Sequence, residues 1–119
     1  MYKLIFYRTE SGNEPVREFI IELRKRNDKD ARINANKIND YLEILQILGK
    51  SAGKPYVKPI EDEIWELRPI RNRVLFAGWS ENCFVLLHCF IKKTRKTPKR
   101  EIDKAKREFA DFLRRNKNG

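Results

Sequence analysis

Apolar residues recur along this chain with two spacings, one typical of strands and one typical of helices. Residues 2–7 (YKLIFY) are aromatic or aliphatic except for one lysine, and they predict a first strand. After the break at 11–15 (SGNEP), Asn13 as cap and Pro15 in the first turn predict the start of a helix that fades near Asn27. The apolar positions of this helix are Val16, Phe19, Ile20 and Leu23.

A second helix is predicted from about residues 28–30 to Gly49, since glycine commonly ends helices. Its apolar positions repeat at intervals of four and three, at Ala31, Ala35, Ile38, Leu42 and Leu45. The two helices together predict a helical hairpin that covers one face of a sheet. Residues 49–63 (GKSAGKPYVKPIEDE) hold glycine and proline throughout and predict a loop.

Three more strands are predicted at residues 63–70, 73–79 and 83–91, with intervening turns short enough for antiparallel hairpins. Thr97 and Pro98 then open a last helix. Its apolar stripe comprises Ile102, Ala105, Phe109, Phe112 and Leu113. The predicted order is βααβββα, an α+β fold in which a helical hairpin and a C-terminal helix pack a small, largely antiparallel sheet. A chain of 119 residues predicts one domain, spanning 1–119.

The composition predicts a soluble, cytoplasmic protein with no membrane partner. The longest apolar run, near 84–91, is far shorter than the ~20 residues that a membrane helix needs. The N-terminal apolar stretch is too short and too interrupted for a signal peptide. Cys83 and Cys89, if they lie on one strand, are about 20 Å apart, which is beyond disulfide reach. Two cysteines with one histidine make no zinc site.

The charge of the chain points to a polyanionic partner. Lys and Arg number 27 and Asp and Glu 17, which leaves a net charge of +10. So basic a small domain most often binds nucleic acid, although a solubility role or an acidic protein partner would also fit. The charge is densest at 92–100 (KKTRKTPKR), where a buried strand runs directly into cations with no acid among them.

Alternation along the last three strands predicts a cluster of polar side chains on one face of the sheet. On the last strand, Cys89 and Ile91 should point the other way, into the core. The residues predicted to line the common surface are Glu66, Arg68, Arg73, His88, Phe90 and Lys92. The prediction depends on strand register, because a slip of one residue exchanges the two faces.

Such a surface suits phosphate-backbone binding, or RNA cleavage without a metal by attack of the 2′-hydroxyl on its own phosphate. Glu66 or His88 could be the proton acceptor, and Lys92 or Lys93 the donor. Further residues expected to bind RNA are Lys58, Phe90, Arg95, Lys96, Lys99 and Arg100. No motif predicts a metal site or a cofactor. Each residue also has a structural interpretation. The arginines could lie on a solvated face or pair with a glutamate, His88 could be a semi-buried structural residue, and Phe90 could belong to the core.

Four short motifs occur in a specific order: E-L-R at 66–68, Arg73, F-x-K-K-T at 90–94 and T-P at 97–98. In this combination, over about residues 60–107, the chain resembles the RelE/ParE toxin superfamily. It is most similar to the phage-derived Gp49-like, HigB-type toxins of type II toxin–antitoxin systems.

The resemblance implies a RelE-like domain that cleaves mRNA in the ribosomal A site and is neutralised by a HigA-like antitoxin, usually one with a helix-turn-helix. By this resemblance, Arg68 and Arg73 lie near the scissile phosphate, and Phe90, Lys92 and Lys93 form the F-x-K-K segment. Glu66 stands where the founding RelE toxins carry lysine, and the C-terminal tyrosine of some relatives has no counterpart. The general base is therefore unassigned. Two other functions are open: a ParE-like toxin that inhibits gyrase, and a non-catalytic nucleic-acid-binding regulator.

Overall fold

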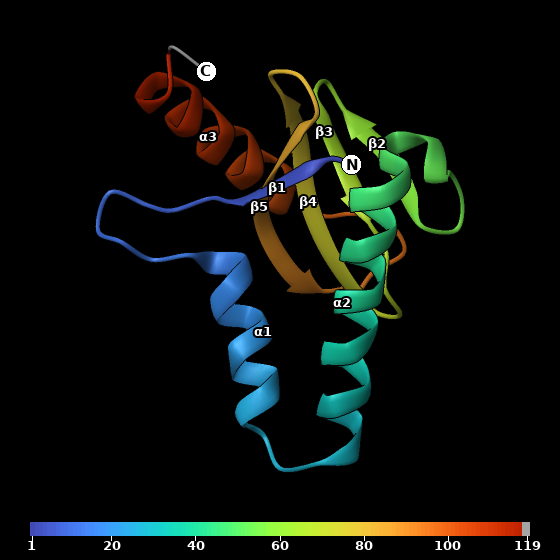
Figure 1. Cartoon of the computed structure of the whole chain (residues 1–119). Coiled ribbons are helices and arrows are strands. Elements are labelled where there is room, and N and C mark those ends of the chain that lie inside the picture. Colours follow the sequence, from blue (N-terminus) through green and yellow to red (C-terminus); the bar gives the residue numbers. More distant parts are fainter. Residues whose placement is uncertain (118–119) are drawn as a thin grey trace.

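The computed structural model, which describes residues 1–117, has an α+β fold with a five-stranded sheet. The elements in chain order are β1 (Lys3–Phe6), α1 (Pro15–Lys25), α2 (Lys29–Leu48), the 3₁₀ helix η1 (Gly49–Ala52), β2 (Val57–Glu61), β3 (Ile64–Leu67), β4 (Asn72–Trp79), β5 (Cys83–Ile91) and α3 (Lys99–Arg115) (Figure 1). The strand order across the sheet is β1-β5-β4-β3-β2. Only the β1–β5 pair is parallel. The predicted α+β class is confirmed.

The prediction of a loop over 49–63 is wrong in its second half, because β2 lies there and pairs antiparallel with β3. Val57 is buried opposite Leu67, and the register shifts between Pro59 and Glu61. β2 is the last strand at its edge of the sheet, where a proline costs no ladder hydrogen bond. The element order is therefore βααββββα rather than βααβββα.

The ends of α1 and α2 follow different rules. The predicted Asn13 cap of α1 is wrong: Glu14 is the N-cap, it makes no side-chain cap bond, and Pro15 is the first helical residue. In α2, Asp28 is the N-cap, and its Oδ1 accepts a hydrogen bond from the Ala31 N–H at 2.7 Å. The predicted end at Gly49 is confirmed, with φ of 61° and its N–H donating to the Leu45 carbonyl.

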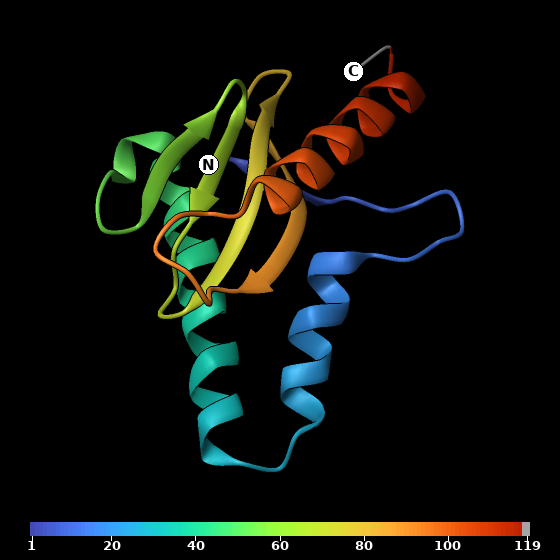
Figure 2. The same cartoon turned by 180° about the vertical axis from the view of Figure 1, so that it is seen from behind.

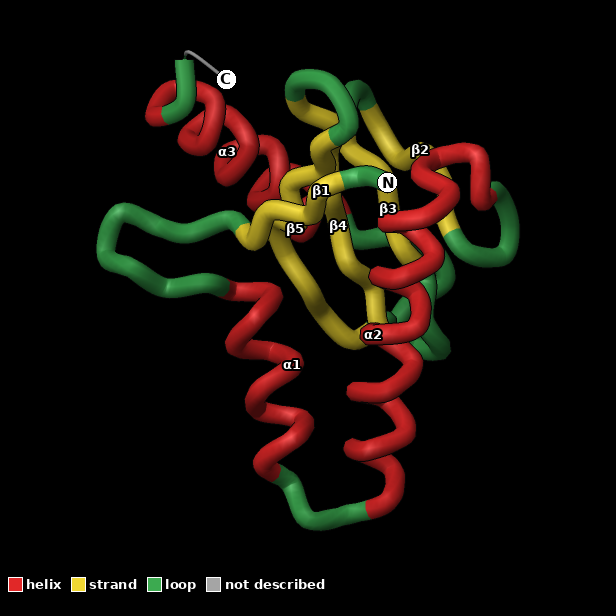
Figure 3. The backbone as a smooth tube through the Cα atoms, in the orientation of Figure 1, coloured by secondary structure: helices red, strands yellow, loops and turns green. Residues whose placement is uncertain are grey.

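The helical hairpin covers one face of the sheet, as predicted, and α3 covers the other (Figures 1 and 2). On the first face, apolar residues of α1 and α2 such as Val16, Ile38 and Leu45 pack with Phe76 and Leu86 of the central strands. On the second face, the packing residues are Tyr7, Ile64, Leu75, Ala77, Val85, Leu87, Phe90, Ala105, Phe109 and Phe112. Figure 3 shows the connection between β1 and α1 as a long loop that projects from this body.

Two predicted core positions are exposed. Ile91, predicted to point into the core, is 49% exposed, because the hairpin does not cover this last residue of β5. Leu113, at the C-terminal end of α3, is 40% exposed. Within residues 1–117, no helix combines the length and the apolar character that crossing a membrane requires.

α3 carries a buried carboxyl group that the sequence pattern did not single out. Glu108 is 8% exposed, and among residues 1–117 its Oε1 has no hydrogen-bond partner. Burial raises the pKa of Glu108 to about 7, although Lys104 and Arg107 on the same helix act in the opposite direction. Tyr7, which follows β1, donates its hydroxyl proton to Asp111 rather than to Glu108, at 2.6 Å from Oδ2, and its own pKa is raised chiefly by burial. The folded protein therefore binds a proton at Glu108 more tightly than the unfolded chain does.

This buried acid predicts a pH dependence of folding stability. Because the pKa of Glu108 is higher in the folded state, its contribution is fully present below about pH 4.5 and is lost as the pH rises through about 7. The expected loss between these values is on the order of 3 kcal/mol in the free energy of unfolding. Urea unfolding at pH 5 and pH 8 measures it, with Glu108→Gln as the matched variant. An equal pH dependence in both proteins would contradict the prediction.

Candidate functional site

A pocket of about 240 Å³ lies between strands β2 to β4 and the segment 92–98 that joins β5 to α3. Its cationic lining residues are Lys58, Arg68, Arg73, Lys92, Arg95 and Lys96. Its other lining residues are Pro59, Ile60, Glu66, Phe90, Thr97 and Ile102. We call it the basic pocket. Most of the residues predicted to form the site therefore come together, and Glu66 is the only acid among those that line it.

Glu66 occupies the floor of the basic pocket and contacts both arginines. Its carboxylate is almost fully buried, and Oε1 lies 3.5 Å from the Nε of Arg68 and 3.6 Å from the Nε of Arg73. Its Oε2 accepts a hydrogen bond from the Thr97 hydroxyl at 2.5 Å. Because both carboxylate oxygens are engaged, Glu66 is placed to position the two guanidinium groups rather than to take a proton from a substrate.

Thr97 is a site residue that the sequence reasoning assigned only to the start of α3. Its hydroxyl joins the segment 92–98 to the floor of the basic pocket through Glu66. The hydrogen bond thereby holds Lys92, Arg95 and Lys96 over the two arginines. The T-P motif marks Thr97 in the sequence. The motif alone does not distinguish a threonine that begins a helix from one whose hydroxyl contacts the site.

The two arginines differ in how completely their donors are satisfied. Arg73 is 6% exposed, and its Nη1 donates to the carbonyls of Ile70 at 3.0 Å and Asn72 at 2.8 Å. Burial lowers the pKa of Arg73, while the Glu66 carboxylate raises it. Arg68 is more accessible, with a side chain 29% exposed against 7% for Arg73, and among residues 1–117 its Nε, which faces Glu66, has no hydrogen-bond partner. Arg68 is thus the better placed of the two to donate to an incoming anion.

His88 does not line the basic pocket, contrary to the prediction. α3 packs over this part of the sheet, so that the Nε2 of His88 lies 2.7 Å from the Oε1 of Glu101. Its ring stacks on Phe90 with centroids 5.7 Å apart. Burial lowers the pKa of His88, which makes the ring neutral at pH 7, so its Nε2–H donates to Glu101. The structure places His88 as a link between β5 and α3.

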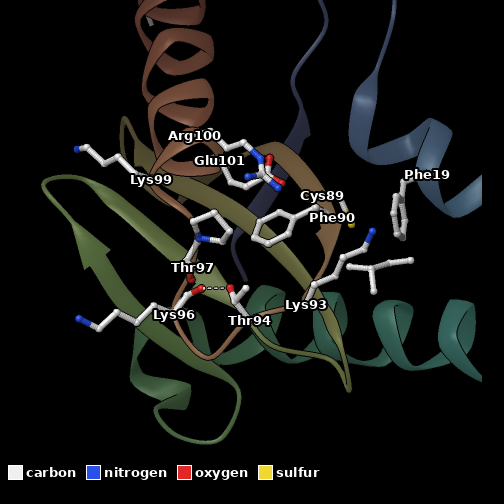
Figure 4. A pocket seen from close by; sticks show the side chains of 12 residues that line it. Phe19, Cys89, Phe90, Lys93, Thr94, Lys96, Thr97, Lys99, Arg100 and Glu101 are labelled. Atoms are coloured by element: carbon white, nitrogen blue, oxygen red, sulfur yellow. Dashed lines mark hydrogen bonds between the residues drawn. The ribbon is translucent and has the colours of Figure 1, made fainter.

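The remaining predicted residues divide between neighbouring surfaces. Phe90 is only 9% exposed and belongs mainly to the core under α3, although it forms part of the pocket wall. Lys93, Lys99 and Arg100 line a second, larger hollow of about 820 Å³, which shares Phe90, Lys96 and Thr97 with the basic pocket (Figure 4). Lys99 also pairs with Glu61, at 3.0 Å between Nζ and Oε2. Within residues 1–117, no three His, Cys, Asp or Glu side chains gather as metal ligands would.

The fold and the pocket together define a small basic α+β protein with a site suited to a phosphate group. The chain belongs to the family described as phage derived protein Gp49-like (DUF891), whose model matches residues 22–110. This is a family of RelE/HigB-type toxins, so a toxin–antitoxin role and a cognate antitoxin follow at family level. No curated protein matches the chain.

Proposed function

We propose that this protein is the toxin of a type II toxin–antitoxin system, a cytoplasmic endonuclease that cleaves mRNA on the ribosome without a metal. The observation that carries the proposal is the pair Arg68 and Arg73, held by one buried carboxylate inside a pocket of lysines and arginines. Family membership over residues 22–110 supports it. The proposal includes a RelE-like domain arrangement and a HigA-like antitoxin partner.

In the proposed reaction, the 2′-oxygen of the mRNA attacks the adjacent phosphorus, and the bond from phosphorus to the 5′-oxygen breaks. Arg68 and Arg73 donate to the non-bridging oxygens, where negative charge grows in the transition state. Lys92 lines the basic pocket and Lys93 does not, so Lys92 is the better placed donor to the leaving 5′-oxygen. The proton of the 2′-hydroxyl passes to solvent, since Glu66 and His88 are both engaged elsewhere.

The positive charge of the chain would favour its binding to the ribosome. A net charge of +10 favours association with a dense polyphosphate and makes that association weaken with salt. Lys58, Arg95 and Lys96 stand at the basic pocket, where they would contact the phosphates on either side of the scissile one.

Primer extension on cellular mRNA after induction tests the proposed function. Discrete cuts that keep a constant register to the reading frame are expected, and purified protein should cut translated message but not free RNA. DNA damage without mRNA cuts would point instead to a gyrase-directed toxin. Nucleic-acid binding without growth arrest would point to a non-catalytic regulator, and either result overturns the proposal.

A further inference from the structure

A third hollow lies beside the basic pocket, at the end of the sheet where β4 begins and β5 ends. It has a volume of about 300 Å³, and it is lined by Ile70 and Arg71 of the turn between β3 and β4, by Arg73 of β4 and by residues 92–95. Five of these residues are lysines or arginines, and within residues 1–117 no acid lines the hollow. We call it the turn hollow. An anion bound there would meet several cations and no competing carboxylate.

The turn hollow and the basic pocket are neighbouring parts of one cationic surface. Arg73, Lys92 and Arg95 line both of them. Arg71, Lys93 and Arg95 are exposed, and none of the three takes part in an ion pair within residues 1–117. A ligand that fills both hollows must carry at least two anionic groups close together, as a nucleic-acid strand does.

The backbone of the turn is held in a conformation that its sequence disfavours. Ile70 has a φ of 57°, in the left-handed region that a β-branched residue rarely adopts. The Asn72 N–H donates to the Pro69 carbonyl at 3.0 Å, which closes the turn. The Nη1 of Arg73 donates to the Ile70 carbonyl, also at 3.0 Å. Such strain persists only where the surrounding structure enforces it, and it is concentrated at functional sites. The turn that carries Arg71 is therefore fixed in place by a residue of the basic pocket.

We propose that the turn hollow is a second phosphate subsite, which binds the mRNA phosphate that follows the scissile one on its 3′ side. Arg71, Lys93 and Arg95 would donate to the non-bridging oxygens of this phosphate. The half-exposed Ile70 is the one apolar residue within 1–117 that lines the turn hollow, and it would pack against the ribose between the two phosphates. The inference rests on the proposed function, because the strand in the basic pocket is taken to be mRNA.

The direction of the strand follows from the place of Lys92. In the proposed reaction Lys92 donates to the leaving 5′-oxygen, which belongs to the nucleotide on the 3′ side of the cut. Lys92 lines both hollows, so this nucleotide passes from the basic pocket towards the turn hollow. The next phosphate along the strand is then the one that the turn hollow holds. Arg71, which the sequence reasoning did not select, thereby becomes a substrate-binding residue.

Binding of an RNA that cannot be cleaved, followed by NMR titration of the full chain at low salt, tests the subsite. The probe is a 2′-O-methyl uridine trimer with two internal phosphates, whose blocked 2′-oxygens cannot attack. A neutral methylphosphonate in place of the 3′ phosphate should weaken binding to the wild type about tenfold, because charge-assisted hydrogen bonds are lost. In Arg71→Ala the same replacement should cost only about threefold, since one of the donors is already gone. Arg107→Ala removes the same charge from the middle of α3 and from neither hollow, so it should keep the full cost.

Equal costs of the 3′ methylphosphonate in the wild type and in Arg71→Ala would overturn the proposal, as would a trimer that leaves the amide signals of residues 70–71 and 93–95 unmoved. Coupling of Arg71 to the 5′ phosphate instead would mean the opposite strand direction and would also contradict it. Weaker ribosome binding by Arg71→Ala with unchanged trimer binding would overturn it by assigning the turn hollow to ribosomal RNA.

Thermal unfolding shows whether Arg71→Ala folds, and Lys93→Ala is the second variant, with the same expected reduction in the cost of the 3′ methylphosphonate. The trimer is never cleaved, so failure of the subsite is distinct from failure of the nuclease assignment, which primer extension decides.

Discussion

Arg68→Ala is expected to abolish growth arrest on induction and to slow mRNA cleavage on ribosomes by about 10²–10³-fold. The reason is that Arg68 is the accessible member of the arginine pair, with a side chain 29% exposed against 7% for Arg73, so that its guanidinium group can reach a bound phosphate. Single-turnover cleavage of a ribosome-bound message measures the effect. Thermal unfolding should change little, because the Arg68 side chain is partly exposed and makes only one ion pair.

Arg32→Ala is the matched control, since Arg32 is an exposed residue of α2, which packs on the face of the sheet opposite to Phe90 of the basic pocket. It removes the same charge and should leave the cleavage rate within about twofold, because distant surface charges act only through the screened field. Full toxicity of Arg68→Ala would remove Arg68 from the site. Equal losses in both variants would mean that the net charge matters rather than this guanidinium.

Glu66→Gln is expected to slow cleavage by about tenfold or more and to destabilise the fold. Glutamine can still accept from Thr97, but the charge that holds Arg68 and Arg73 together is lost. Breaking a buried ion pair commonly costs about 3–5 kcal/mol, and an effect towards the lower end is expected because Arg68 is partly exposed. Urea unfolding and single-turnover cleavage together measure the two effects.

The pH–rate profile separates a positioning role of Glu66 from a general-base role. If Glu66 positions the arginines, Glu66→Gln lowers the rate by a similar factor at every pH and leaves the shape of the profile unchanged. If Glu66 took the proton of the 2′-hydroxyl, the variant would lose the acidic limb of the profile. Thr97→Val is a useful companion, because it removes only the hydroxyl bond to Oε2 and should give a smaller loss of rate.

Local sequence pattern was sufficient for the elements whose apolar spacing is long and regular. The stripe of α2, from Ala31 to Leu45, predicted both the helix and the face that it buries. The local pattern failed for β2, because Gly53 and Pro55 precede this strand of five residues and Pro59 lies within it, so that only its pairing with β3 reveals it. Edge strands tolerate such residues, so their local signal is weak.

The site was predictable as a set of cations on one face, but its internal contacts were not. Strand alternation placed Arg68, Arg73 and Glu66 together, and the register agrees with that placement. Strand alternation does not predict where α3 packs on the sheet. This packing places Glu101 within hydrogen-bond distance of His88. The bond between Thr97 and Glu66 joins residues 31 positions apart and has no local signature either.

A phosphorothioate at the scissile position tests most directly whether the arginine pair binds the reacting phosphate. Once primer extension has located a cut, the two diastereomers of the message are cleaved on ribosomes by the wild type and by Arg68→Ala. The wild type is predicted to cut one diastereomer about tenfold more slowly than the other, because sulfur accepts a guanidinium hydrogen bond poorly. The difference should disappear in Arg68→Ala. An equal preference in both proteins would show that Arg68 does not contact the scissile phosphate, and the account of the site would be wrong.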